Sequence, residues 1–382
     1  MASESKVEVY DKAIDKGLEG IVACTTAVSS IVDATLTYAG YTIDDLSEHS
    51  TFEETTFLLW NKRFPKVTEL EKFKKDLAQN MILEKEYVNF LKGLPNKNVH
   101  PMEWLRTAVS GLALWDKEAT DISAESNQHK ALRLTAKMGP IVAALERFRT
   151  GQQLLEPKLD KSLAWNFLYL LKGKEPDPYH VKVFDTALIL HADHELNCSA
   201  FSVRVTTSSL SDLHSAITSG IGTLKGPLHG GANEQVMKML LKIGNMKECE
   251  TFVKNALENK EKVMGFGHRV YKNGDPRARI LKSMSQELGK RRGEPQWYDM
   301  SVHIDDIMQD KKGLLPNVDF YSASVYYCLD VPIDLYTPIF AVSRISGWIA
   351  HAFEQYANNR IYRPRGHYSG NRDLKWVAPD KR

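Results

Sequence analysis

Residues 226–234 read Gly-Pro-Leu-His-Gly-Gly-Ala-Asn-Glu, which sets one histidine between glycines at the start of a helical pattern. The apolar residues from Val236 to Ile243 recur at helical spacing, so His229 is expected just before a helix N-terminus. Unpaired backbone N–H groups and the positive end of the helix dipole favour a neutral imidazole there, which can donate a hydrogen bond to a developing oxyanion. A glycine-rich turn with a solvated histidine is an equally open interpretation of this stretch alone.

The same helical spacing extends over most of the chain on both sides of this stretch. Thr51–Glu54 and Thr68–Glu71 match capping boxes, and Pro101 suits the first turn of a helix. Strand-forming residues gather between Leu18 and Tyr41. The sequence therefore predicts an all-α fold with a minor N-terminal β element. Further helices are expected over residues 131–149, 161–171, 178–198, 211–220, 233–242, 246–259, 275–288, 296–308 and 338–359.

Composition bounds the class of protein. The chain has 382 residues, 43% of them hydrophobic, and a net charge of +2 with acids and bases interspersed, which argues against a nucleic-acid partner. Its four cysteines are far apart, as is typical of reduced thiols. The N-terminus lacks a signal or transit pattern, and the most apolar late segment, residues 337–353, is interrupted by Arg344. We expect a cytoplasmic protein without a membrane partner.

A second histidine motif, His191-Ala192-Asp193-His194-Glu195, lies in an expected helix. Its H-x-x-H-E spacing differs from both the H-E-x-x-H and the H-x-x-E-H zinc signatures, so we expect no metal site. A buried structural pair and a histidine that contacts a substrate stay open, and the second is favoured.

Residues 265–272 read Gly-Phe-Gly-His-Arg-Val-Tyr-Lys, which begins like a dinucleotide fingerprint. The match fails because Val270 stands where the third glycine belongs and no strand precedes the motif. Closely spaced glycines and the nearby cations Arg269, Lys272, Arg277 and Arg279 instead favour an anionic ligand over a solvated basic turn.

Residues 316–322 read Pro-Asn-Val-Asp-Phe-Tyr-Ser and place a carboxylate among apolar side chains at a helix start. Asp319 is either a helix N-cap or a base of raised pKa at the apolar edge of a cleft, able to act on a weakly acidic C–H.

Taken in order, GPLHGGANE, MGFGHRVYKNGDPRAR and PNVDFYS resemble the three signature blocks of the citrate synthase family. The resemblance extends to the flanking segments GLEGIVACTTAVSSI, HADHELN and SRISGWIAHAFEQ and to the RPR tail, and so covers nearly the whole chain. It implies an all-α homodimer with a large domain, residues 1–221 and 330–382, and a small domain, residues 222–329. The glycines near residue 222 would be the hinge between them.

The family condenses acetyl-CoA with oxaloacetate to citrate, the entry to the tricarboxylic acid cycle, without a metal or cofactor. The resemblance implies that His229 binds the thioester oxygen, that Asp319 removes a methyl proton, and that His268 polarises the oxaloacetate carbonyl. Other implied contacts are His194, Arg277, Arg344 and, from the other subunit, Arg363 for oxaloacetate, and Gly265, Phe266, Gly267, Lys272 and Lys312 for CoA.

Three alternatives stay open. A 2-methylcitrate synthase, which uses propionyl-CoA, differs by one methylene in its substrate, and the motifs do not distinguish it. A non-catalytic helical binding protein is disfavoured because His229, His268 and Asp319 are all present. A zinc hydrolase is the third class.

Overall fold

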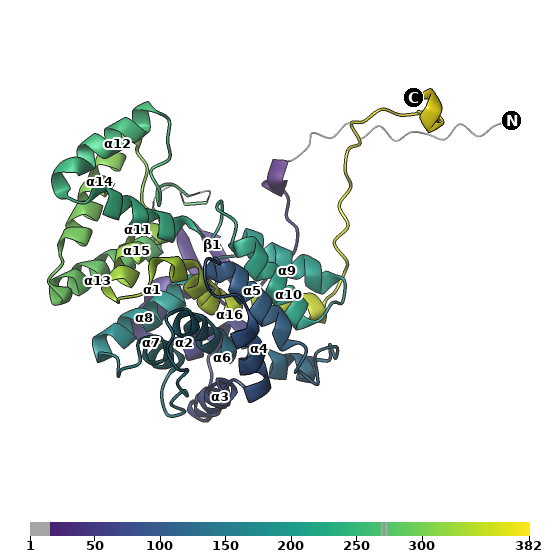
Figure 1. Cartoon of the computed structure of the whole chain (residues 1–382), viewed down its shortest axis with the longest axis horizontal. Helices are drawn as coiled ribbons and strands as arrows, with labels where there is room; N and C mark the ends of the chain where they lie inside the picture. The colour runs from purple at the N-terminus through teal and green to yellow at the C-terminus, as the bar shows by residue number, and fades with distance from the viewer. Residues whose placement is uncertain (1–15, 269, 272–273) are drawn as a thin grey trace. The chain divides into compact units, whose positions relative to one another are not determined.

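The computed structural model describes residues 16–268, 270–271 and 274–382 (Figure 1). Residues Thr26–Arg360 form one compact unit, and the described residues of Met1–Thr25 together with Ile361–Arg382 form a second. The second unit contains two single turns of 3-10 helix, Lys16–Leu18 and Pro379–Lys381. All elements discussed below belong to the first unit.

The first unit is built mainly from α-helices, which confirms the predicted fold class. In chain order they are α1 (Ile43–His49), α2 (Phe52–Asn61), α3 (Val67–Asn80), α4 (Lys85–Gly93), α5 (Pro101–Leu112), α6 (Ala124–Arg149), α7 (Leu163–Lys172), α8 (Pro178–His191), α9 (Cys198–Ser208), α10 (Leu213–Leu224), α11 (Ala232–Ile243), α12 (Cys249–Glu258), α13 (Pro276–Arg292), α14 (Gln296–Lys312), α15 (Val318–Cys328) and α16 (Tyr336–Ala357). Short 3-10 turns at Met246–Glu248 and Ile333–Leu335 precede α12 and α16.

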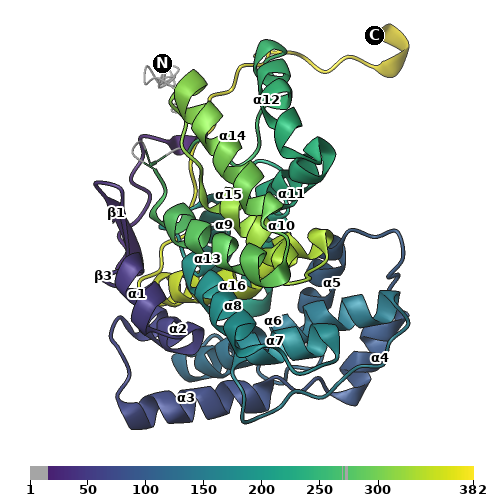
Figure 2. The ribbon, with the colours of Figure 1, turned by 90° about the vertical axis from the view of Figure 1, so that its left-hand side faces the viewer.

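The predicted β element is a small antiparallel sheet of β1 (Ser29–Val32), β2 (Thr35–Tyr38) and β3 (Tyr41–Thr42), which lies beside α1 (Figure 2). Tyr38 is fully buried, and its hydroxyl donates to the carbonyl oxygens of Ile189 (3.1 Å) and Asp193 (2.9 Å). The sheet is therefore anchored to the end of α8, where one of the predicted histidine motifs lies.

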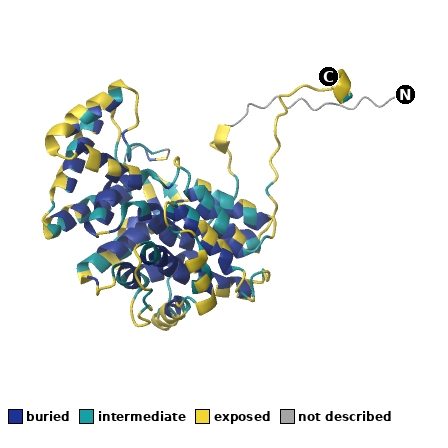
Figure 3. Ribbon diagram, in the orientation of Figure 1, coloured by how far each residue is buried: buried dark blue, intermediate teal, exposed yellow. Residues whose placement is uncertain are grey.

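Helix α16 is the centre of the core. Most of its residues from Tyr336 to Ala352 are buried, and it packs against α2, α6, α8, α9 and α10 (Figures 1 and 3). A helix that is apolar around most of its circumference belongs in a protein interior. The indole Nε1 of Trp60 on α2 donates to the carbonyl of Ser346 (3.0 Å) and holds the two helices together. Arg344 therefore lies in the interior, on a helix that is buried over most of its length.

Helices α11 to α15 pack chiefly against one another, with α15 between α11 and α13 (Figure 1). They fall within the predicted small domain, residues 222–329. Because Thr26–Arg360 is one compact unit, the division at these boundaries stays a prediction.

Several predicted helix boundaries differ from the structure: α6 begins at Ala124 and not at residue 131, and α10, α13 and α14 each extend four residues beyond their predicted ends. Two further differences have a visible physical cause. The capping box at Thr68 is displaced, because α3 begins at Val67 and Glu69 Oε2 accepts from the backbone N–H of Lys66 (2.7 Å), which is the N-cap. The helix expected over 178–198 ends at His191, and α9 starts at Cys198. Carbonyls at the end of α8 are bonded instead by α16, since Arg344 Nε donates to His191 (2.8 Å) and the Gly347 N–H to Ala192 (3.2 Å).

Across residues 16–268, 270–271 and 274–382, no helix is both long enough and apolar enough to cross a lipid bilayer.

Candidate active site

Three aromatic side chains meet where the loop after α8 faces the loop before α13. His194 Nε2 lies 3.1 Å from the hydroxyl of Tyr271, and the rings of His194 and His268 have centroids 5.0 Å apart. The ring centroids of Tyr271 and His268 lie 4.6 Å apart, and the Arg277 guanidinium lies 6.0 Å from the centroid of the Tyr271 ring. His194, His268 and Arg277, predicted separately from two motifs, are therefore neighbours. Tyr271 was not predicted as a site residue.

His268 is neutral, and its tautomer is fixed by the backbone. Its Nδ1 accepts from the N–H groups of Val270 (3.1 Å) and Tyr271 (3.2 Å), so the ring proton lies on Nε2. Burial, and then the charge of Arg277, lower the pKa of His268 to about 4. A neutral ring with a proton on Nε2 can donate a hydrogen bond to a carbonyl oxygen.

The glycine loop that carries His268 is attached to the start of α15. Gly265 O accepts from the N–H of Asn317 (2.9 Å), the N–H of Gly267 donates to Leu315 O (2.9 Å), and Asn317 Nδ2 donates to Gly267 O (3.0 Å). This short antiparallel pairing fixes His268 relative to Asp319, two residues beyond Asn317. The backbone of Gly265 to Gly267, assigned to CoA by resemblance, is thus partly engaged within the protein.

Gly265 is required at the centre of this pairing. Its φ is +84°, and an added Cβ would lie 2.8 Å from the Phe320 ring and 2.9 Å from Val236 Cγ2. We expect Gly265→Ala to lower the free energy of unfolding by about 2–4 kcal/mol, because left-handed backbone strain adds to overpacking. Gly293→Ala is the matched control in urea denaturation, since Gly293 has φ +75° and open space around it. Equal losses in the two variants would contradict the steric argument.

Arg277 is buried and held by Asp275, the N-cap of α13. Asp275 accepts from Nε (2.9 Å) and Nη2 (2.7 Å) of Arg277, and its Oδ2 also accepts from the N–H of Val318 at the start of α15 (3.0 Å). Burial raises the pKa of Asp275, but Arg277 outweighs it and holds the carboxyl below its usual range. Asp275, which was not predicted as a site residue, holds Arg277 and the start of α15 together.

We expect Asp275→Ala to lower the free energy of unfolding by about 3–5 kcal/mol, because it removes one partner of a buried ion pair. Asp177→Ala is the comparison, since Asp177 is an exposed N-cap that accepts from the N–H of Tyr179 (2.7 Å). Loss of a cap alone costs about 0.5–2 kcal/mol. If the two variants were equally stable in urea titrations, Asp275 would be acting only as a cap.

Asp319 is not the N-cap of α15; that residue is Asn317, whose Oδ1 accepts from the N–H of Asp319 (3.0 Å). The Asp319 side chain therefore does not cap the helix. The residue is only 8% exposed, and its Oδ1 is buried without a hydrogen-bond partner. Burial raises the pKa of Asp319 to about 7, against the opposing charge of Arg277. A buried carboxylate of this pKa is suited to act as a general base near neutral pH.

Arg344 enters the same region from α16. Beyond its bond to the His191 carbonyl, its guanidinium lies 4.8 Å from the centroid of the Phe340 ring. Burial lowers the pKa of Arg344 to about 10, so it stays cationic at neutral pH. His191 itself is a buried structural residue, with Nδ1 bonded to Ala187 O (2.7 Å) and a pKa lowered by burial to about 3.

His229 lies in the turn before α11, as predicted, and Gly231 is the N-cap. The Nε2 of His229 accepts from the backbone N–H of Ser199 (3.3 Å) and lies 2.8 Å from Ser199 Oγ. Ser199 Oγ in turn accepts from Trp348 Nε1 (3.0 Å). With Nε2 as acceptor, the proton of the neutral ring lies on Nδ1. Burial, and then Arg344, lower the pKa of His229 to about 4. Ser199 was not predicted, because no local pattern links it to His229.

The remaining predicted residues are Lys312, Lys272 and Arg363. Lys312 is exposed at the end of α14, and Lys272 lies outside the described residues. Arg363 is exposed in the unit formed by the chain ends. Among the residues that the structure describes, no three His, Cys, Asp or Glu side chains are grouped as metal ligands.

Comparison with known proteins gives consistent matches over nearly the whole chain. The family described as citrate synthase, C-terminal domain, matches residues 17–365. Citrate synthase 2 of Bacillus subtilis is 55% identical over 96% of this chain and 99% of its own length, and 2-methylcitrate synthase 2 of Corynebacterium glutamicum is 40% identical over 96% and 97%. The citrate synthase of Thermoplasma acidophilum, solved in a ternary complex with carboxymethyl coenzyme A and oxaloacetate, superposes with a TM-score of 0.90, at 30% identity and over 96% and 99% of the two chains.

The helical fold carries a buried carboxyl group of raised pKa, two neutral imidazoles and two buried arginines. The chain belongs to the citrate synthase family and is an acyl-transferring enzyme.

Proposed function

We propose that this enzyme condenses acetyl-CoA with oxaloacetate and water to give citrate and free CoA. The observation that carries the proposal is Asp319, a buried carboxyl of raised pKa with an unpartnered oxygen, which is within reach of the charges of Arg277 and Arg344. The methyl group of a thioester is a very weak acid, so a carboxylate can deprotonate it only if the enolate oxygen is stabilised as it forms.

In the proposed reaction Asp319 takes a proton from the methyl carbon, and the C–H electron pair becomes the enolate. The Nδ1–H of His229 donates to the enolate oxygen, in agreement with the tautomer set by Ser199. The enolate carbon attacks the ketone carbon of oxaloacetate, whose oxygen receives a hydrogen bond and then a proton from His268 Nε2. Hydrolysis of the resulting thioester releases citrate and the CoA thiol.

The two carboxylates of oxaloacetate are assigned to arginine, whose planar fork matches a carboxylate. Arg277 and Arg344 are buried near His194, and these three side chains are the proposed binding partners of oxaloacetate. We extend the proposal to Arg363, contributed across a cytoplasmic homodimer, and to CoA contacts at Lys312, Lys272 and residues 265–267. Closure of a small domain, residues 222–329, over the substrates is part of the same proposal.

The second candidate is 2-methylcitrate synthesis from propionyl-CoA, favoured by the 40% identity to the Corynebacterium enzyme. One methylene in an apolar pocket is worth about 1–3 kcal/mol, so the two activities are expected to overlap.

Release of the CoA thiol with oxaloacetate and each acyl-CoA in turn tests both candidates. We expect kcat/KM to be about 10- to 200-fold higher for acetyl-CoA. The activity should persist after exhaustive chelation, because the proposed steps use only side chains. A higher kcat/KM for propionyl-CoA would overturn the first candidate, and no thiol release with either would overturn both.

A further inference from the structure

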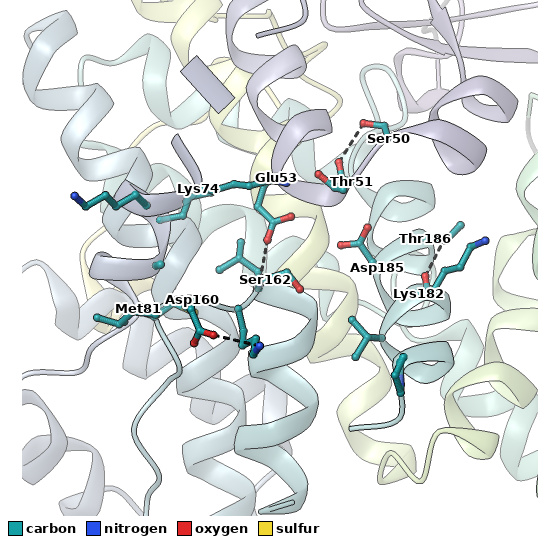
Figure 4. Close-up of a pocket in the computed structure, with 18 of the residues that line it drawn as sticks. Ser50, Thr51, Glu53, Lys74, Met81, Asp160, Ser162, Lys182, Asp185 and Thr186 are labelled. Carbon is teal, nitrogen blue, oxygen red and sulfur yellow. Dashed lines mark hydrogen bonds and ion pairs between the residues drawn. The ribbon is translucent and has the colours of Figure 1, made fainter. Parts of the chain in front are cut away.

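A cavity of about 590 Å³ lies outside the candidate active site, between the start of α2, α3, the start of α7 and α8 (Figure 4). Its volume falls within the range typical of small-molecule sites. Two carboxyl groups, those of Glu53 on α2 and Asp185 on α8, face one another across it (Figure 4).

Glu53 is held rigidly and leaves one oxygen without a partner. Its side chain is anchored by Oε1, which accepts from the N–H of Leu163 at the start of α7 (2.7 Å), and the residue is only 2% exposed. Oε2 is buried with no hydrogen-bond partner, and it points toward Asp185 (Figure 4). An unsatisfied buried acceptor is destabilising, so a ligand that supplies a donor here would gain free energy from the new hydrogen bond.

Asp185 supplies the second carboxyl group. Both of its oxygens accept from the backbone N–H of Phe52 at the start of α2 (3.4 and 3.2 Å). Burial and the charge of Glu53 raise the pKa of Asp185 well above its ordinary value. A cation placed between the two carboxyls would offset the effect of Glu53 and favour the ionised form of Asp185.

The entrance carries the opposite charge. Four exposed lysines line it, among them Lys74 and Lys182 on opposite sides of the carboxyl pair (Figure 4), and only two exposed acids, Glu48 and Asp160, accompany them. A polycation would be repelled at this entrance, whereas a ligand with outward-facing carboxylates would be attracted. Apolar side chains such as Leu77, Met81 and Val181 form the walls between the two regions and suit methylene groups.

We propose that this cavity binds a small amino acid, with its ammonium group between Glu53 and Asp185 and its carboxylates toward the lysines. An acidic amino acid matches this arrangement best, because its ammonium group suits the Glu53–Asp185 pair and its two carboxylates suit the lysines at the entrance. An ammonium group has three donors and can bridge both carboxyls, which a neutral hydroxyl with one donor cannot do.

Calorimetric titration of the full-length protein with L-glutamate tests the proposal, with glutarate as the matched ligand that lacks the ammonium group. We expect saturable one-to-one binding of L-glutamate and none of glutarate. Glu53→Gln should weaken binding at least about 10-fold, a loss of about 1.4 kcal/mol. Glu86→Gln on α4 should leave binding unchanged, because Glu86 is exposed and is not among the residues that line the cavity.

Lys182→Gln supplies a second test that does not depend on a buried position, and we expect it to weaken L-glutamate binding several-fold. Equal binding of glutarate, unchanged binding by Glu53→Gln and Lys182→Gln, or absence of saturable binding would each overturn the proposal. So would binding that oxaloacetate abolishes, because it would place the ligand at the active-site arginines.

Discussion

Asp319→Asn is expected to lower kcat by about 100- to 10,000-fold while oxaloacetate still binds, because an amide cannot accept the methyl proton. The variant keeps the shape of the side chain and the N-cap bond at Asn317, so the site should stay assembled. Steady-state thiol release measures kcat, and calorimetry measures oxaloacetate binding. Asp310→Asn on the exposed end of α14 is the matched control and should be fully active.

The wild-type pH profile adds a constraint on the same residue. Since the base must be ionised and the pKa of Asp319 is raised to about 7, kcat/KM should fall below about pH 7. His229 and His268 stay neutral over this range, because their pKa values are lowered to about 4. Unchanged turnover in Asp319→Asn would remove Asp319 as the base.

The same substitution should stabilise the fold in alkaline solution. Between the ordinary pKa of 3.8 and about 7, the folded protein keeps a proton on Asp319 that the unfolded chain has lost. Its free energy of unfolding therefore falls as the pH rises through this window. Asp319→Asn lacks this loss, so from pH 4 to pH 8 it should gain about 2–4 kcal/mol over the wild type in urea denaturation. A destabilising buried carboxylate at a proposed catalytic position is typical of a trade-off between stability and function.

Much of the fold was predictable because it rests on local patterns. Helical spacing, the N-cap Thr51 and the first-turn Pro101 depend on residues within a few positions of one another, and the structure confirms them. The end of α8 was not predictable, because bonds from Arg344 and Gly347, more than 150 residues away, decide where its carbonyls are satisfied. Local propensity in that stretch favours continuing the helix.

The site divides in the same way. His229, His268 and Asp319 stand in motifs whose glycines, prolines and neighbouring apolar residues are visible in the sequence. Ser199 and Asp275 act through partners that only the folded chain supplies: Ser199 sets a tautomer, and Asp275 joins Arg277 to the start of α15. Predicting them requires knowing which loops meet, which a single sequence does not contain.

The two histidines are set to opposite tautomers by backbone N–H groups. In His268 these groups occupy Nδ1 and leave Nε2–H available; in His229 the Ser199 N–H occupies Nε2 and leaves Nδ1–H available. Each ring therefore offers a donor with no proton transfer needed beforehand. A backbone N–H keeps its position when its own side chain changes rotamer, whereas a serine hydroxyl rotates. The backbone therefore fixes each histidine tautomer more rigidly than a serine hydroxyl would.

This argument separates the effects of two neighbouring substitutions. His229→Ala removes the donor to the enolate oxygen and should lower kcat by about 100- to 1,000-fold, as loss of one oxyanion donor does elsewhere. Ser199→Ala keeps the backbone N–H that sets the tautomer, so kcat should fall less than about 10-fold, even though Trp348 Nε1 loses its acceptor. If Ser199→Ala were as inactive as His229→Ala, the Ser199 hydroxyl and not its backbone N–H would determine the tautomer of His229. If His229→Ala raised KM for acetyl-CoA with kcat unchanged, His229 would contribute equally to ground-state and transition-state binding, and the oxyanion role would have to be assigned to another donor.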